Sequence, residues 1–156
     1  MKLDTIDLRI LAELQTDGSL SNVELARRVH LSPSPCLARV KALEKAGVIA
    51  RYVALANASA LGLGLNVFIN ISLRTPATES LADFERRTAE HDEVMECYLM
   101  SGDADYLIRV ALADIGALER FIVEQLTPIP GIEKIRSSFT LKQVRYKTAL
   151  PLPAAG

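Results

Sequence analysis

The stretch "HLSPSPCLARVKALEKAGVI", His30 to Ile49, places two prolines directly ahead of a run that otherwise reads as a helix. Proline lacks an N–H and its ring clashes with the preceding turn, but at a helix start that N–H has no partner anyway. Pro33 and Pro35 therefore mark a helix start, with Ser32 as the N-cap. The pattern predicts a helix that ends just before Gly47, the residue past its C-terminus.

Two more helices are expected ahead of this one. Asp4 caps a helix that ends at the turn Asp17-Gly18, and Ser21 opens another in capping-box spacing with Glu24. A short turn at His30-Leu31 then leads to the proline-started helix. Two helices joined by so few residues are the helix-turn-helix pattern.

The third helix has an outer side that suits DNA. At about 100° per residue its apolar residues cluster on one side, while the other side is small, polar and basic. Such a surface fits a major groove about 12 Å wide. We expect Arg39 to approach base edges and Lys41 and Lys45 to contact phosphates. The candidate DNA-contacting residues are Ser32, Ser34, Pro35, Ala38, Arg39, Lys41 and Lys45.

Charge is distributed unevenly along a chain whose formal net charge is −1. Residues 1–60 hold eight Lys or Arg against six Asp or Glu, and residues 61–156 hold ten against thirteen. Within 27–51 six basic residues face Glu44 alone. A local excess of this kind favours phosphate binding, although a solvated helix face remains an alternative.

Composition excludes several other classes. The 156 residues are 49% hydrophobic and 24% charged, typical of a globular protein, and the apolar runs are too short to span a bilayer. The start "MKLDTIDLRI" lacks the apolar stretch of a signal peptide, so we expect a cytoplasmic protein that does not bind membranes. Cys36 and Cys97 lack ligand spacing and are expected to be buried hydrophobes. No metal or cofactor is expected.

The second half alternates strands with helices. "LNVFINISLR" (65–74) alternates apolar and polar residues, 81–90 is helical, and 94–100 and 106–112 are strands around the turn "SGDAD". Asp114 caps a helix, and 132–146 is a last long strand. The order is that of the ferredoxin-like split βαβ unit. Helices on one face leave the other face uncovered, which predicts that a second subunit covers it.

The whole chain is therefore expected to be an α+β protein of two domains. Residues 1–52 form a winged helix-turn-helix domain, with a small wing after Gly47, and 53–64 form a connecting strand and hinge. Residues 65–150 form a ferredoxin-like βαββαβ domain that is expected to oligomerise, and 151–156 form a tail, of which the final "PAAG" is expected to be dispensable.

Three stretches together resemble the Lrp/AsnC family of leucine-responsive, or feast/famine, transcription regulators. They are "LSPSPCLARVKALEKAGVI", "MSGDADYLIRV" and "SSFTLKQVRYKTALPL", in this order over nearly the whole chain. The resemblance implies double-stranded DNA and an amino-acid effector as partners, a homodimer that assembles to an octamer, and control of amino-acid metabolism genes.

The resemblance also turns the acidic hairpin into a candidate effector site, although alone it reads as a good turn. An α-amino acid is a zwitterion, so Asp103 and Asp105 are expected to bind its ammonium and the Gly102 amide its carboxylate. Asp105→Ala is then expected to abolish the amino-acid response. The candidate effector-binding residues are Leu99, Met100, Ser101, Gly102, Asp103, Asp105, Ser137 and Ser138.

Two functions of other classes compete with this interpretation. A ferredoxin-like enzyme is one, but His30 and His91 lack a nucleophile or metal-ligand partner at useful spacing and no Gly-rich phosphate loop occurs, so no catalytic residue is assigned. Both histidines are expected at the surface or at helix ends. The other is an amino-acid sensor that acts through protein partners, which tight, salt-sensitive binding to DNA excludes.

Overall fold

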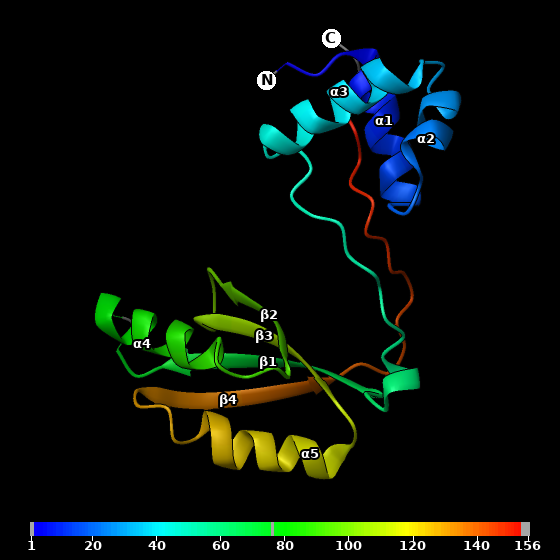
Figure 1. Cartoon of the computed structure of the whole chain (residues 1–156). Coiled ribbons are helices and arrows are strands. Elements are labelled where there is room, and N and C mark those ends of the chain that lie inside the picture. Colours follow the sequence, from blue (N-terminus) through cyan, green and yellow to red (C-terminus); the bar gives the residue numbers. More distant parts are fainter. Residues whose placement is uncertain (1, 76, 154–156) are drawn as a thin grey trace. The chain divides into compact units, whose positions relative to one another are not determined.

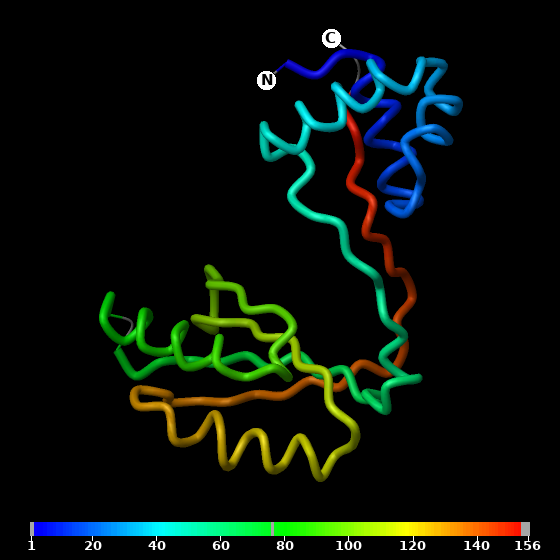
Figure 2. Tube along the Cα trace, viewed as in Figure 1, coloured from blue at the N-terminus to red at the C-terminus, as the bar shows by residue number. Residues whose placement is uncertain are grey.

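The computed structural model describes residues 2–75 and 77–153, which form two compact units. The first comprises the chain up to Leu55 together with the segment from Val144, and the second comprises Ala56–Gln143. Figure 2 follows the chain from the N-terminal helices into the sheet and back to the first unit.

Three helices make up the core of the first unit: α1 (Thr5–Thr16), α2 (Asn22–Arg28) and α3 (Pro33–Lys45) (Figure 1). Asp4 caps α1 in a complete capping box with Asp7. Ser21 caps α2 by accepting from the Glu24 N–H at 3.2 Å, but the expected capping box is only half formed because the Glu24 carboxylate binds arginines instead.

Helix α3 begins where the prolines predict. Ser32 is its N-cap and Pro33 its first residue. It ends at Lys45, and Gly47 has a φ of 70°, the left-handed conformation that a helix C-terminus favours. The apolar stripes of the three helices meet in one core. Its buried members are Ile10, Leu11, Leu25, Ala26, Val29, Cys36, Val40 and Leu43.

The expected wing strands are not formed. Residues 51–57 pair with no other strand, and Val53 and Leu55 are exposed. An extended segment becomes a strand only when a neighbouring strand accepts its hydrogen bonds, and within one described chain this segment has no such neighbour. The expected hinge that follows contains one short 3₁₀ turn, η1 (Ser59–Leu61).

The second unit is a four-stranded antiparallel sheet of order β2-β3-β1-β4. Its strands are β1 (Leu65–Leu73), β2 (Val94–Leu99), β3 (Tyr106–Leu112) and β4 (Ile132–Phe139). Helix α4 (Thr78–Thr88) connects β1 to β2, and α5 (Ile115–Arg120) with its π-helical continuation η2 (Phe121–Leu126) connects β3 to β4. The predicted βαββαβ order is therefore present.

One face of the sheet is covered by the helices. Val67, Ile69 and Ile71 alternate along β1, are fully buried, and pair with apolar residues of β3. Phe84 of α4 and Leu118 of α5 pack on the same cluster. The opposite face carries Asn70, Ser72 and other residues of intermediate burial.

Two expectations about this unit are wrong. Strand β4 ends at Phe139 rather than Tyr146, because its partner β1 begins at Leu65 and Thr140 makes the last backbone bond, to Asn66 at 3.2 Å. Cys97 is exposed, because β2 is an edge strand, whereas Cys36 is buried as expected.

Residues 151–153, the described start of the expected C-terminal tail, belong to the first unit. The side-chain amide of Gln15 accepts from the Leu150 N–H at 2.7 Å and donates to the Leu150 carbonyl at 3.2 Å. Leu152 then packs against the helical core. Leu152, ahead of the final "PAAG", thus helps to close the core of the unit that carries α3.

Candidate functional site

Helix α3 is held rigidly at its N-terminus. The preceding turn closes α2 with His30 at a φ of 59°, while the Leu31 N–H donates to the Ala26 carbonyl at 2.9 Å. The Asn22 side chain donates to the Pro33 carbonyl at 2.8 Å, which ties the start of α2 to the start of α3. Sequence reasoning missed Asn22, because its partner is a backbone group eleven residues away.

The outer side of α3 is open. Cys36, Val40 and Leu43 face the core, whereas Leu37, expected beside them, is 41% exposed. Six of the seven candidate DNA-contacting residues are exposed; they are Ser32, Ser34, Pro35, Ala38, Lys41 and Lys45. Only Arg39 is half-buried. The helix thus brings a small, polar and basic surface together as its spacing predicts.

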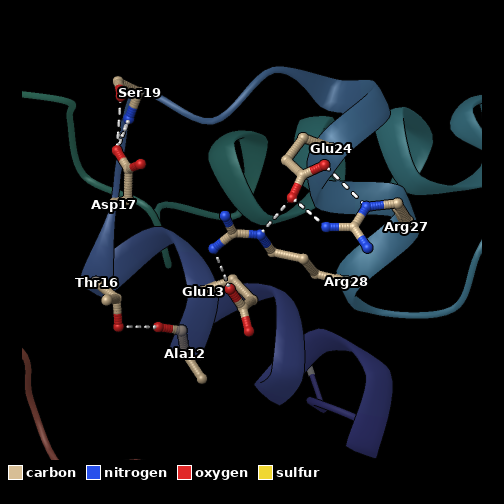
Figure 3. A network of polar contacts seen from close by, with 8 residues as sticks. All are labelled: Ala12, Glu13, Thr16, Asp17, Ser19, Glu24, Arg27 and Arg28. Atoms are coloured by element: carbon tan, nitrogen blue, oxygen red, sulfur yellow. Dashed lines mark hydrogen bonds and ion pairs between the residues drawn. The ribbon is translucent and has the colours of Figure 1, made fainter.

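The apparent basic excess is partly neutralised within the unit. Figure 3 shows Glu24 between two arginines, Arg27 at 2.7 Å and Arg28 at 2.8 Å. Arg28 also reaches Glu13 of α1 at 3.1 Å. The hydrogen bonds from Arg27 and then Arg28 lower the pKa of Glu24 to about 2. Arg27 and Arg28 are therefore already paired with carboxylates in the protein without DNA.

Arg39 has partners as well. Its Nη1 lies 2.7 Å from Asp4 Oδ2 and 2.8 Å from Asp7 Oδ1, and the Asp7 side chain is only 11% exposed. The Asp7 backbone N–H and then the Arg39 guanidinium hold the pKa of Asp4 below its usual value. This contact joins α3 to the N-terminus of α1.

Three cations of the 27–51 segment stay without a carboxylate partner in the part of the chain that the structure describes: Lys41, Lys45 and Arg51. Both lysines belong to the exposed side of α3. The phosphate contacts that this unit offers are thus concentrated on the outer side of α3 and just beyond its end.

The second unit has a cavity of about 220 Å³ beside the β2–β3 hairpin. Three of the candidate effector residues line it: Met100, Ser101 and Asp103. The remaining lining residues were not predicted; they are Asn70, Ser72, Ala104, Lys134 and Arg136. They come from β1, β4 and the hairpin, and only the register of the sheet brings them together.

The other candidate effector residues do not line this cavity. The Asp105 carboxylate accepts the Leu73 N–H at 2.6 Å, and its own N–H donates to the Ile71 carbonyl at 2.9 Å, so Asp105 pins the hairpin to β1. Gly102, at a φ of 137°, supplies the turn without lining the cavity. Ser137 pairs with Ile69 and Ser138 with Phe68, both further along the ladder.

Leu99 lines a different cavity, of about 360 Å³, between α4 and β2. Thr88 and Cys97 line it too, and at one end Tyr106 donates to Glu85 at 2.7 Å. Burial, helped by Glu85, raises the pKa of Tyr106. Leu99 and Met100, which are adjacent in the sequence and were both predicted to bind the effector, therefore line two different cavities.

Each of the two histidines lies just after a helix. His30 forms the turn between α2 and α3, and the His91 ring meets the Phe121 ring edge-on at 5.8 Å. Among residues 2–75 and 77–153, no group of three or more His, Cys, Asp or Glu side chains could hold a metal ion. No helix of that same part is long and apolar enough to cross a membrane.

A helix-turn-helix unit joined to a sheet with its own cavity defines a class of protein, the DNA-binding regulators that carry a separate ligand-binding domain. Residues 3–50 match the family model of the winged helix-turn-helix DNA-binding domain, and residues 66–150 match that of the Lrp/AsnC ligand-binding domain. The chain belongs to the Lrp/AsnC family of transcriptional regulators.

Several relatives are similar in sequence over nearly the whole chain. The leucine-responsive regulatory protein of Rhizobium meliloti is 42% identical, covering 93% of both chains. The Bkd operon transcriptional regulator of Pseudomonas aeruginosa is also 42% identical, covering 97% of this chain and 99% of its own. The structure of a Neisseria meningitidis transcriptional regulator in complex with L-Met superimposes with a TM-score of 0.92 at 41% identity, covering 96% and 97%.

Proposed function

We propose that this regulator binds a pseudo-palindromic DNA site through the outer side of α3, and that an α-amino acid bound beside the β2–β3 hairpin changes its DNA affinity or its assembly. The first part rests on Lys41 and Lys45, which are exposed, have no carboxylate partner among the described residues, and share the outer side of α3 with Ser34 and Ala38. They combine phosphate-binding charge with side chains short enough to let the helix approach base edges.

The cavity beside the hairpin supports the second part. It lies within the region that matches the Lrp/AsnC ligand-binding domain, and it presents both cationic and anionic side chains. The similar regulator of Neisseria meningitidis was solved in complex with L-Met. A small amino acid, apolar or moderately polar, is therefore the effector class that we infer.

We further propose a cytoplasmic homodimer that assembles to an octamer, controls amino-acid metabolism genes and acts by binding rather than catalysis. Phe68 and Leu107 are half-buried on the face of the sheet opposite the helices, where a second copy would cover them. Large apolar residues near the connecting segments are exposed as well; they include Val53, Leu55, Leu141, Val144 and Tyr146. Light scattering at several concentrations tests this assembly, and a strict monomer would contradict it.

The experiment for the function is a DNA titration followed by an effector titration. Fluorescence anisotropy with the protein's own upstream region is expected to give tight, salt-sensitive binding, with half-sites about 34–36 Å or a multiple apart. Calorimetry with the twenty amino acids then identifies the effector, and light scattering monitors assembly. An amino-acid binder without DNA affinity would be a sensor acting through protein partners, and a DNA binder indifferent to every amino acid would be an effector-independent regulator.

A further inference from the structure

The cavity beside the hairpin is bounded by charges of both signs. Lys134 and Arg136 are two residues apart on β4, so both side chains project from the same face of the sheet. Their register partners on β1 are Ser72 and Asn70, whose polar side chains line the same cavity. Asp103 completes the wall from the hairpin.

The two cations of this wall are exposed and have no protein partner among the described residues. Among residues 2–75 and 77–153, neither Lys134 nor Arg136 has a carboxylate within 4.0 Å, and neither donates a side-chain hydrogen bond to a protein group. The other strand arginine on this face, Arg109, behaves differently. It pairs with Glu96 at 2.7 Å and also donates to Asn66 at 3.3 Å. Of the two strand arginines on this face, Arg109 is therefore paired with a carboxylate, whereas Arg136 at the cavity has none among the described residues.

Lys134 and Arg136 lie about 6.5–7 Å apart along β4, since a strand rises about 3.3 Å per residue. Two like charges held this close repel each other, and an anion between them relieves that repulsion. A carboxylate fits this position, because its two oxygens accept from two donors at once. The adjacent Asn70 side-chain amide offers further hydrogen bonds.

Asp103 supplies the opposite charge from the hairpin. Its backbone carbonyl accepts from Ser72 Oγ at 3.5 Å, which keeps the hairpin against the end of β1, while its exposed carboxylate has no cationic partner within the described residues. A wall with cations on β4 and an anion on the hairpin matches a zwitterion. Met100, 44% exposed, adds an apolar surface at the same cavity.

We propose that Lys134 and Arg136 bind the α-carboxylate of the effector and that Asp103 binds its α-ammonium. This inference rests on the proposed function, because it names the side chains by which the same site selects its ligand. The ligand class is a free α-amino acid whose side chain lies toward Met100. The amide and the decarboxylated amine of such an amino acid lack the anion that Lys134 and Arg136 would bind, so both are expected to bind more weakly.

The place of the cavity in the sheet is compatible with a dimer. Lys134 pairs with Ser72 in the last part of the β1–β4 ladder, next to the bulge between Ser72 and Leu73, whereas Phe68 and Arg109 pair near the middle of the sheet. A second copy that covers the middle of this face therefore leaves the hairpin end as its rim. A small ligand at that rim can be reached from solvent.

Calorimetry on the full-length protein tests the proposal, with L-methionine and L-methioninamide as probes. Lys134→Gln and Arg136→Gln each remove one cation, and Lys142→Gln removes an exposed cation of the same unit that does not line the cavity. We expect L-methionine affinity to fall at least tenfold in the first two variants and to be unchanged in the third. The wild-type protein is expected to bind L-methioninamide at least tenfold more weakly than L-methionine.

The outcomes separate this inference from the function on which it rests. Binding of L-methionine that is equal in wild type, Lys134→Gln and Arg136→Gln leaves the effector function intact and overturns the carboxylate assignment. Equal affinity of the wild type for L-methionine and its amide overturns it without any mutation. A wild-type protein that binds none of the twenty amino acids overturns both.

Discussion

At the scale of single residues, the sequence correctly identifies the surface of α3 and misjudges its charge. The segment 27–51 shows one acid among six bases, yet three of its arginines are paired with carboxylates. Asp4, Asp7 and Glu13 come from α1, outside the segment. Only tertiary packing brings them to Arg28 and Arg39, so a count along the chain cannot reveal the neutralisation.

Arg39→Ala is expected to act on stability as well as on DNA. Removing the guanidinium leaves the Asp4 and Asp7 carboxylates without their cation, so the free energy of unfolding should fall at neutral pH, by the modest amount typical of a partly exposed ion pair. The folded-state pKa of Asp4 is lowered, so this stabilisation is present above its ordinary value of 3.8 and is lost as pH falls below it. Urea unfolding at pH 7 and pH 3 measures the difference between variant and wild type. A variant as stable as wild type at pH 7 would show that Arg39 is free for bases.

Asp105→Ala and Asp103→Ala form a matched pair on the hairpin. Asp105 accepts the Leu73 N–H, so its loss leaves a half-buried donor without a partner and should lower the free energy of unfolding by about 1–3 kcal/mol. Asp103 is exposed and lines the cavity, so its loss should weaken amino-acid binding with little change in stability. Thermal unfolding and amino-acid calorimetry on both variants check this. A destabilised Asp103→Ala together with an Asp105→Ala of wild-type stability would contradict these roles.

At the scale of elements, starts are better predicted than ends. Pro33, Asp4 and Ser21 identify helix starts because the capping chemistry is local. Strand β3 runs from Tyr106 to Leu112 as its alternation predicts. The end of β4 depends instead on where β1 begins, a fact that no local pattern contains. Lys134 and Arg136 were missed for the same reason, since the register that places them beside Ser72 and Asn70 is non-local.

The C-terminal segment gives a prediction at this scale. Leu152 packs against the helical core, whereas Leu150 is 73% exposed and contributes its backbone to Gln15. Leu152→Ala should therefore lower the free energy of unfolding of the first unit by roughly 1–2 kcal/mol, and Leu150→Ala should leave it nearly unchanged. Urea unfolding followed by far-UV circular dichroism compares the two. Equal changes in the free energy of unfolding for the two variants would show that Leu152 does not contribute to the core.

At the scale of the whole molecule, two units divide the work of one regulator. The first unit takes its core from both ends of the chain, and the second unit carries the hairpin cavity. An effector bound in one unit can alter DNA affinity only by its differential affinity for two assembly or conformational states, typically about 1–3 kcal/mol. A graded modulation of DNA binding is therefore expected rather than an absolute switch.

The most direct test of DNA binding through α3 is the salt dependence of DNA affinity, measured for Lys41→Ala with Lys142→Ala as the control. Lys41 lies on the open side of α3 without a carboxylate partner in the described part of the chain, and Lys142 is an exposed lysine of the other unit. If α3 lies in the major groove with Lys41 on a phosphate, Lys41→Ala weakens binding to all sequences and lowers the slope of log K against log salt by about one. The Lys142→Ala slope stays at the wild-type value. Equal slopes for wild type, Lys41→Ala and Lys142→Ala would contradict DNA binding through this surface.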